Sequence, residues 1–156
     1  MFELGEIDCR VHIYNQYCKG NKNEKISSII STTVDKYLSV LSDLVSKGYK
    51  VVMLSPTPTG TEKNIYHKPF FADFKTRAKI TRDFHQKLKL EAEKKNISYI
   101  NLYDMVVSKE GGIKNIFRAD EVHLNQKVVP ITLSLLNALK HYNKNKCNQI
   151  KKDLPS

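Results

Sequence analysis

The chain has 156 residues, of which 40% are hydrophobic and 27% charged. This length and composition suit one globular domain with a sizeable core, and they exclude a disordered protein. No apolar run approaches the roughly 18 to 20 residues that span a bilayer, and the N-terminal residues lack the basic and apolar regions of a signal peptide. We therefore expect no membrane association and a cytoplasmic location.

The formal net charge of +10 raises the question of an anionic partner. Lys and Arg supply phosphate affinity when they cluster, but here they are spread along the chain among acidic neighbours. Only the stretch 141–152 is locally rich in Lys and Asn. We expect a single α/β domain over residues 1–143, a basic flexible tail over 144–156, and no nucleic-acid partner.

The three cysteines, Cys9, Cys18 and Cys147, are odd in number and irregularly spaced. This favours free thiols in a reducing compartment, so we expect no disulfide. Cys9, His12 and Cys18 do not have the spacing of a common zinc site, and no fourth ligand is evident. We expect neither a metal nor a cofactor.

The first elements are a strand, a loop and a helix. Residues 1–7 are predicted to form a short buried strand, and residues 15–24, rich in Asn, Lys and Gly, a loop. A helix is predicted from Ile26, where apolar residues recur at intervals of three and four. Gly48 stands where a left-handed residue would end it.

The remaining elements continue this alternation. Residues 49–54 are a β-branched strand, ended by Pro56 and Pro58, which cannot donate to a ladder. A second helix carries an apolar face from Phe74 to Ala92 and ends at Asn96. Residues 97–102 form a third strand, and a last helix spans about 126–141, with Pro130 in its first turn.

This order predicts an α/β fold, a three-layer sandwich with a parallel sheet between helices. Such sheets bind ligands beyond the carboxyl ends of their strands. The segments to inspect are therefore 6–12, 55–60 and 103–125.

The sharpest chemical signal is the pair Asp120 and His123, in the loop before the last helix. In a hydrolase the carboxylate would bind Nδ1 of the histidine and leave Nε2 to take a proton from a nucleophile. On a structural interpretation, Asp120 would only cap the entry to the helix and His123 would lie on the surface.

A second signal follows the first strand, where Gly5, Glu6, Asp8, Arg10 and His12 stand close together in sequence. Charged side chains concentrated at such a junction need partners. They would form a pocket rim that orients substrate, or a structural Asp–Arg pair that ties down the loop.

Gly5-Glu6-Ile7-Asp8 and Asp120-Glu121-Val122-His123-Leu124 together resemble two motifs of the SGNH, or GDSL-type, hydrolases. That family has a Gly-x-Asn-Asp block after its third strand and an Asp-x-x-His block before its last helix. The resemblance covers nearly the whole chain. It implies Asp120 and His123 as catalytic residues and Gly5, Glu6, Asp8 and Arg10 as the substrate or oxyanion region.

Two features depart from the family pattern. The Gly-Asp-Ser block that carries the nucleophile and the oxyanion glycine of the second strand are absent from the sequence, as in a fold truncated at its N-terminus. Ile7 also stands in place of the oxyanion asparagine, a donor whose loss typically costs about a hundred- to a thousand-fold in rate. Ser55 and Cys9 are alternative nucleophiles, but they are more simply a strand-ending residue and a small buried thiol.

The resemblance therefore implies half of an esterase or acyltransferase for an acyl ester or acylated carbohydrate, inactive alone for want of its serine. The strand at 2–7 would have an open edge, for an N-terminal half or a second copy of the chain. The alternatives are a catalytically silent domain that binds carbohydrate or protein, and a basic nucleic-acid-binding protein. His67, Phe70 and Phe71 would line an acyl or sugar pocket, or form a lid packed on the core.

Overall fold

The computed structural model describes residues 2–3, 5–20, 23–60, 72–120 and 123–152, with side chains in 5–20, 23–60, 72–120 and 123–140. Three strands form its sheet, β1 (Phe2–Glu3), β2 (Val52–Leu54) and β3 (Ser98–Ile100). Both pairings are parallel and the order is β1-β2-β3. Met53 in the central strand is in register with Phe2 on one side and Tyr99 on the other.

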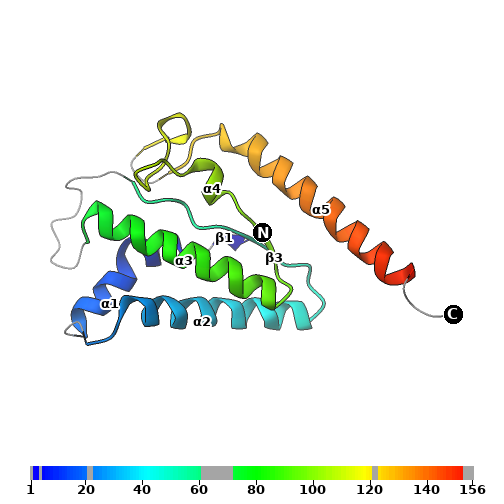
Figure 1. The fold of residues 1–156 in the computed structure, drawn as a ribbon, viewed down its shortest axis with the longest axis horizontal. Helices are drawn as coiled ribbons and strands as arrows, with labels where there is room; N and C mark the ends of the chain where they lie inside the picture. Colours follow the sequence, from blue (N-terminus) through cyan, green and yellow to red (C-terminus); the bar gives the residue numbers. More distant parts are fainter. Residues whose placement is uncertain (1, 4, 21–22, 61–71, 121–122, 153–156) are drawn as a thin grey trace.

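Helices cover both faces of this sheet (Figure 1). The helices α2 (Ile26–Ser46) and α3 (Phe74–Lys94) pack on each other below it, whereas α5 (Val128–Lys152) lies above it. Alternate residues of β2 follow this division: Met53 packs with the α2 and α3 residues, and Leu54 packs with the residues of α5. The predicted α/β three-layer architecture is thus confirmed.

The ends of the two long helices agree with the sequence signals. Gly48, just beyond α2, has φ +86°, and Asn96, just beyond α3, has φ +53°. Asp73 caps the start of α3, because its side chain accepts a hydrogen bond from the Thr76 N–H at 2.8 Å. The prolines after β2 end that strand as expected.

The N-terminal region differs from the prediction. Among the described residues the strand covers Phe2–Glu3, and Glu6 and Ile7 are already helical. A π-helix then runs over Asp8–His12, and α1 spans Ile13–Lys19. The predicted loop at 15–24 is therefore wrong over 15–19. The reason is the period: Ile13 is buried and Tyr14 and Tyr17 pack against the core from one side of α1, although the local composition is polar.

The C-terminal region also differs from the prediction. A short helix α4 (Tyr103–Val106) and a 3₁₀ turn (Asn115–Phe117) precede α5. The helix α5 contains Pro130 in its first turn, as expected, but continues to Lys152, past the end predicted near residue 141. None of the described helices has the length and apolar character needed to cross a membrane.

Candidate functional site

The segment with Asp120 and His123 is a tight loop whose two ends are joined. Arg118 and Leu124 form an antiparallel bridge, and the Asn125 N–H donates to the Phe117 carbonyl at 2.7 Å. The Asn125 side-chain amide adds hydrogen bonds to the carbonyls of Ile116 at 3.0 Å and Arg118 at 3.2 Å. The loop is therefore fixed at its base and projects Asp120 and His123 from its tip.

Both carboxylate oxygens of Asp120 contact His123. Oδ1 accepts from the His123 backbone N–H at 2.9 Å, and Oδ2 lies 2.7 Å from Nδ1. No described residue reaches Nε2 within hydrogen-bond distance. Asp120 does not cap α5, which begins only at Val128. The geometry holds the imidazole by Nδ1 and leaves Nε2 open to a proton donor.

The two side chains are exposed, His123 at 73% and Asp120 at 58%. An ion pair or hydrogen bond this open to water is weak, because the solvent screens it. The same pair would gain strength if a further segment covered it and excluded water.

A hollow of about 780 Å³ brings His123 together with the N-terminal block. Gly5, Glu6, Ile7 and Asp8 line it, as do Tyr37 from α2 and apolar residues at the ends of β2, β3 and the start of α5. We refer to it as the His123 hollow. Of the predicted substrate-region residues, only Arg10 is not among those that line it.

Gly5 is required at the wall of this hollow. Its φ is +93°, a conformation that side chains disfavour, and a Cβ there would lie 2.4 Å from Cε1 of Phe84. The Gly5 carbonyl also accepts from the Cys9 N–H at 2.8 Å, which starts the helical turn after the strand. The glycine therefore lets the chain turn from the sheet edge into the hollow while Phe84 packs against it.

The charged residues of this block have partners other than the expected ones. Arg10 Nε lies 3.2 Å from Glu6 Oε1 as an ion pair, without hydrogen-bond geometry. Asp8 accepts a hydrogen bond from the Tyr37 hydroxyl, and its Oδ1 lies 3.3 Å from Nδ1 of His12. The predicted Asp–Arg pair is thus replaced by a Glu6–Arg10 pair, since these side chains share one face of a helix where a loop was expected.

Neither alternative nucleophile is suited to attack. Ser55 is 2% exposed at the end of β2, and its hydroxyl accepts from the Tyr103 N–H at 2.7 Å. Burial, and then the charge of Asp8, raises the pKa of the Cys9 thiol well above its usual value. A buried thiol of raised pKa is not a thiolate at neutral pH.

Neither family models nor curated sequences match the chain. Solved structures do, among them a GDSL-like lipase from Bacteroides thetaiotaomicron, with 18% identity, a TM-score of 0.52, and coverage of 76% of this chain and 53% of that one. The fold is that of the SGNH, or GDSL-type, hydrolases. A putative acylhydrolase from Bacteroides fragilis also matches, with 17% identity, a TM-score of 0.53, and coverage of 76% of this chain and 52% of that one.

A third match is described as a putative platelet activating factor from Streptococcus pneumonia, with 13% identity and a TM-score of 0.51. It covers 72% of this chain and 51% of that one. The chain thus spans about half the length of the structures it matches.

Several site residues were missed or lie outside the described residues. Tyr37 was predicted only as part of the apolar face of its helix, and nothing in that pattern signals its hydrogen bond to Asp8. Glu121 and Val122, within the Asp-x-x-His motif, lie outside the described residues, as do His67, Phe70 and Phe71.

Proposed function

We propose that this chain is the acid/base half of an SGNH-type ester hydrolase or acyltransferase, with an acyl or acetyl ester as substrate. One observation carries the proposal: Asp120 holds Nδ1 of His123 at 2.7 Å, and the histidine lines the same hollow as the Gly5–Asp8 block. Two motifs separated by more than a hundred residues of sequence thus meet at one concave site.

In the proposed reaction, His123 Nε2 takes the proton of a serine hydroxyl as the serine oxygen attacks the ester carbonyl. The imidazolium then gives this proton to the departing alcohol, and an acyl-serine remains. Water, or an acceptor hydroxyl in a transferase, enters by the same route and releases the acyl group. Asp120 fixes the imidazole orientation and stabilises its positive charge throughout.

The serine would come from a segment that pairs with the open side of β1, either in the same polypeptide or in a separate one. Support comes from the order of the described strands, in which β1 pairs only with β2. In addition, the match covers only 53% and 52% of two of the matched structures, so nearly half of each of those proteins lies outside the matched part. An unpaired strand edge offers backbone donors and acceptors to such a segment.

The surface beside this edge supports docking as well. Three large apolar side chains of the His123 hollow are about half exposed: Ile7 at 51%, Val129 at 51% and Leu133 at 54%. Apolar residues grouped around a concave site favour burial against another element. A docked segment would cover them and remove water from Asp120 and His123.

The test is acetyl-ester hydrolysis by the chain expressed together with the coding sequence that flanks it. We expect turnover, a loss of at least a thousand-fold in His123→Ala, and little change in Asp43→Asn, whose exposed carboxylate on α2 pairs with Lys47 beyond the end of that helix. Turnover that survives His123→Ala would refute the proposed base.

Docking is tested by a matched pair of variants. Leu133→Asp adds a charge to the apolar rim of the hollow, whereas Leu90→Asp adds the same charge at an equally exposed site on α3. We expect the first to lower turnover in proportion to weaker assembly and the second to leave it unchanged. Equal effects of the two variants would count against docking at this hollow. If the isolated chain forms a stable dimer that Leu133→Asp disrupts, the docking partner is a second copy of the chain and not a serine-bearing segment.

A second candidate, a catalytically silent domain that binds carbohydrate or protein, is favoured by one observation. Among the described residues that line the His123 hollow, the hydroxyl groups belong to Tyr37, Thr57 and Thr132, and none to serine. The Tyr37 and Thr132 hydroxyls already donate, to Asp8 and to the Val128 carbonyl. Ester hydrolysis by the chain expressed with its flanking sequence distinguishes the two candidate functions, because a silent domain shows no turnover that depends on His123.

A further inference from the structure

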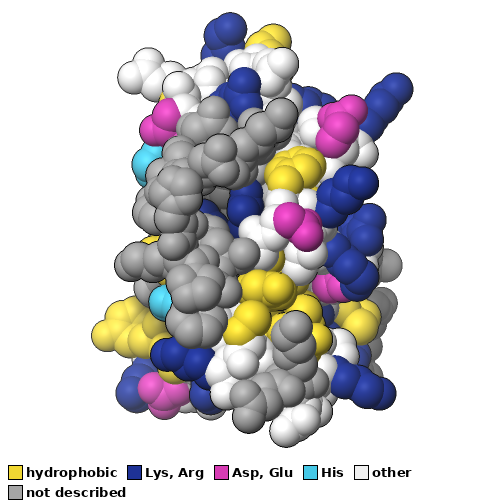
Figure 2. Space-filling view, turned by 90° about the vertical axis from the view of Figure 1, so that its left-hand side faces the viewer, with side chains coloured by type: hydrophobic (Ala, Val, Ile, Leu, Met, Phe, Trp, Pro, Cys, Tyr) yellow, Lys and Arg dark blue, Asp and Glu magenta, His cyan; other side chains and the backbone are white. Residues whose placement is uncertain are grey.

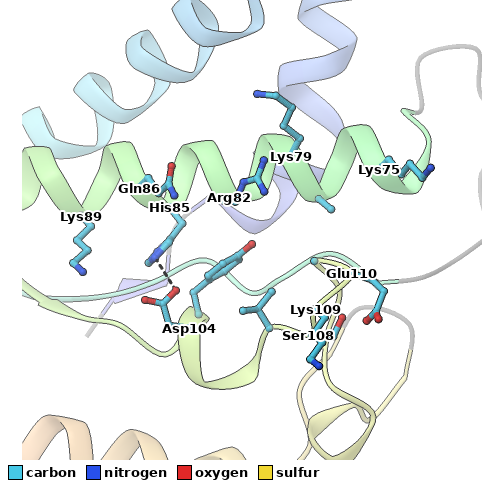
Figure 3. A pocket seen from close by; sticks show the side chains of 14 residues that line it. Lys75, Lys79, Arg82, His85, Gln86, Lys89, Asp104, Ser108, Lys109 and Glu110 are labelled. Atoms are coloured by element: carbon cyan, nitrogen blue, oxygen red, sulfur yellow. Dashed lines mark ion pairs between the residues drawn. The ribbon is translucent and has the colours of Figure 1, made fainter.

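A second hollow, of about 500 Å³, lies between α3 and the segment that follows β3 (Figure 3). We refer to it as the α3 hollow. It shares no lining residue with the His123 hollow. Gly111 allows its two walls to approach, because a Cβ at this position, where φ is +94°, would come within 2.9 Å of the Ala78 Cβ.

The lining of the α3 hollow is strongly basic. Its carboxylates are Asp104 and Glu110, and its five cations are Lys75, Lys79, Arg82, Lys89 and Lys109. The α3 cations recur at helical spacing, so residues that look scattered in the sequence gather on one face of the helix. The space-filling view likewise shows Lys and Arg side chains gathered along one side of the molecule (Figure 2).

Several of these charges have no compensating partner in the part of the chain that the structure describes. Lys79 pairs with Asp83, and Arg82 Nε lies 3.8 Å from the same carboxylate, at the limit of an ion pair. No described carboxylate lies within ion-pair distance of Lys75, Lys89 or Lys109. The hollow therefore has an excess of positive charge that a bound anion would neutralise.

The floor of the hollow adds a neutral donor. Tyr103 is 4% exposed, its ring stacks on His85 at 4.5 Å, and no described residue hydrogen-bonds its hydroxyl. Since it is not among the buried atoms without a partner, this hydroxyl is reached by solvent and is available to donate to a ligand in the hollow. His85 itself is held by Tyr99 at 2.8 Å on Nδ1 and faces Asp104 at 3.5 Å from Nε2.

We propose that the α3 hollow binds a small ligand carrying more than one phosphate group. Arg82, Lys89, Lys109 and the Tyr103 hydroxyl would donate to its oxygens. Arg82 and Lys89 are seven residues apart on α3, or about 10.5 Å of helix at 1.5 Å per residue, which exceeds the reach of a single anionic group. The hollow's volume lies in the range of small-molecule sites.

A small ligand fits these features better than a nucleic acid does. Single-stranded nucleic acids bind where exposed aromatic rings stack on their bases. Among the described residues, the aromatic rings that line the hollow belong to Tyr103 and His85, and these two rings already stack on each other. The hollow thus offers hydrogen-bond donors for phosphate oxygens but no exposed aromatic ring on which a base could stack.

The test is calorimetric titration of the purified chain with inorganic pyrophosphate at low ionic strength, with acetate as a singly charged comparison. Charge-matched double variants isolate the hollow: Arg82→Gln with Lys89→Gln inside it, and, away from it, Lys36→Gln on α2 with Lys47→Gln just beyond the end of α2. We expect pyrophosphate binding to weaken more than ten-fold in the first, less than two-fold in the second, and about three-fold or more in Tyr103→Phe. Acetate should not bind measurably.

Three results would overturn this assignment. Equal weakening in both double variants would mean that diffuse charge, and not the hollow, attracts the anion. No binding of pyrophosphate to the unaltered chain would remove the site. Binding of single-stranded RNA a hundred-fold tighter than pyrophosphate, lost in the same hollow variant, would replace the small ligand with a nucleic acid. None of these results depends on the activity proposed for His123.

Discussion

Asp120 binds His123 twice, through the backbone N–H at 2.9 Å and through Nδ1 at 2.7 Å. The first hydrogen bond fixes the position of the His123 backbone, and the second fixes the orientation of its imidazole ring. Together they hold Nε2 away from the carboxylate, although most of both side chains is exposed to water.

Replacing Asp120 by Asn tests whether the carboxylate sets the histidine tautomer. An amide N–H can donate to Nδ1, so the ring proton would move to Nε2 and block its use as a base. We expect the ¹⁵N chemical shifts of His123 to report mainly the Nδ1–H tautomer in the unaltered chain and a shift toward Nε2–H in Asp120→Asn. Asp43→Asn should leave these shifts unchanged. Identical spectra for all three proteins would show that Asp120 does not orient the ring.

Gly5→Ala tests the turn that brings the N-terminal block to the hollow. The new Cβ meets Phe84 and forces an unfavourable φ, so we expect a loss of roughly 2–5 kcal/mol in the free energy of unfolding. Gly48→Ala is the matched control, because it has a similar φ of +86° and nothing within 4 Å of the added atom. Its loss should be about 1–2 kcal/mol. Urea unfolding measures both, and equal losses would mean that Phe84 yields without cost.

His85 should make the fold sensitive to acid. Burial is the main cause that lowers the pKa of His85, the charge of Lys89 lowers it further, and Asp104 opposes them. A lowered pKa means that the folded chain prefers the neutral ring. The stability that neutral His85 contributes is therefore present above about pH 6.5, its pKa in the unfolded chain, and is lost as the pH falls through its pKa in the folded chain.

Urea unfolding across this range checks the acid sensitivity. The change in the free energy of unfolding that His85 causes is at most about 1.4 kcal/mol per pH unit, because only one proton is taken up. In His85→Gln the slope between pH 7 and pH 5 should be smaller than in the unaltered chain. An unchanged slope would assign the acid sensitivity to other groups.

Cys9 should resist alkylation in the folded chain. Its thiol is 2% exposed and has a raised pKa, whereas Cys18 is only partly buried on α1. With iodoacetamide at pH 8, peptide mass spectrometry should find Cys18 modified before Cys9, and both modified at similar rates in urea. Faster labelling of Cys9 than of Cys18 under native conditions would restore it as a candidate nucleophile.

The layers of the fold could be predicted from the sequence, because hydrophobic periodicity shows which segments are helices or strands and which face each one buries. The repeat from Ile26 and the prolines after Leu54 placed α2 and β2 within a few residues of their observed ends. The same reasoning failed at residues 15–19, where polar composition outweighed a helical period that only the packing of Tyr14 and Tyr17 makes evident.

The site was predicted in part for a similar reason. Asp120 and His123 are three residues apart, so their hydrogen bond is local and could be read from the sequence. The pairing of Asp8 with Tyr37 spans 29 residues and depends on how α2 crosses the N-terminal block. The basic face of α3 could have been found from helical spacing, by placing Lys75, Lys79, Arg82 and Lys89 on one helix face.

We propose that His123 and Asp120 of this chain supply the base and its orienting carboxylate, while the nucleophile comes from another segment. The most direct measurement is p-nitrophenyl acetate hydrolysis by the purified chain and by His123→Ala at matched concentration. We expect both proteins to hydrolyse the ester at the same low rate, because neither holds the nucleophile. Turnover in the unaltered chain that His123→Ala abolishes would contradict it, because a nucleophile would then lie within these 156 residues.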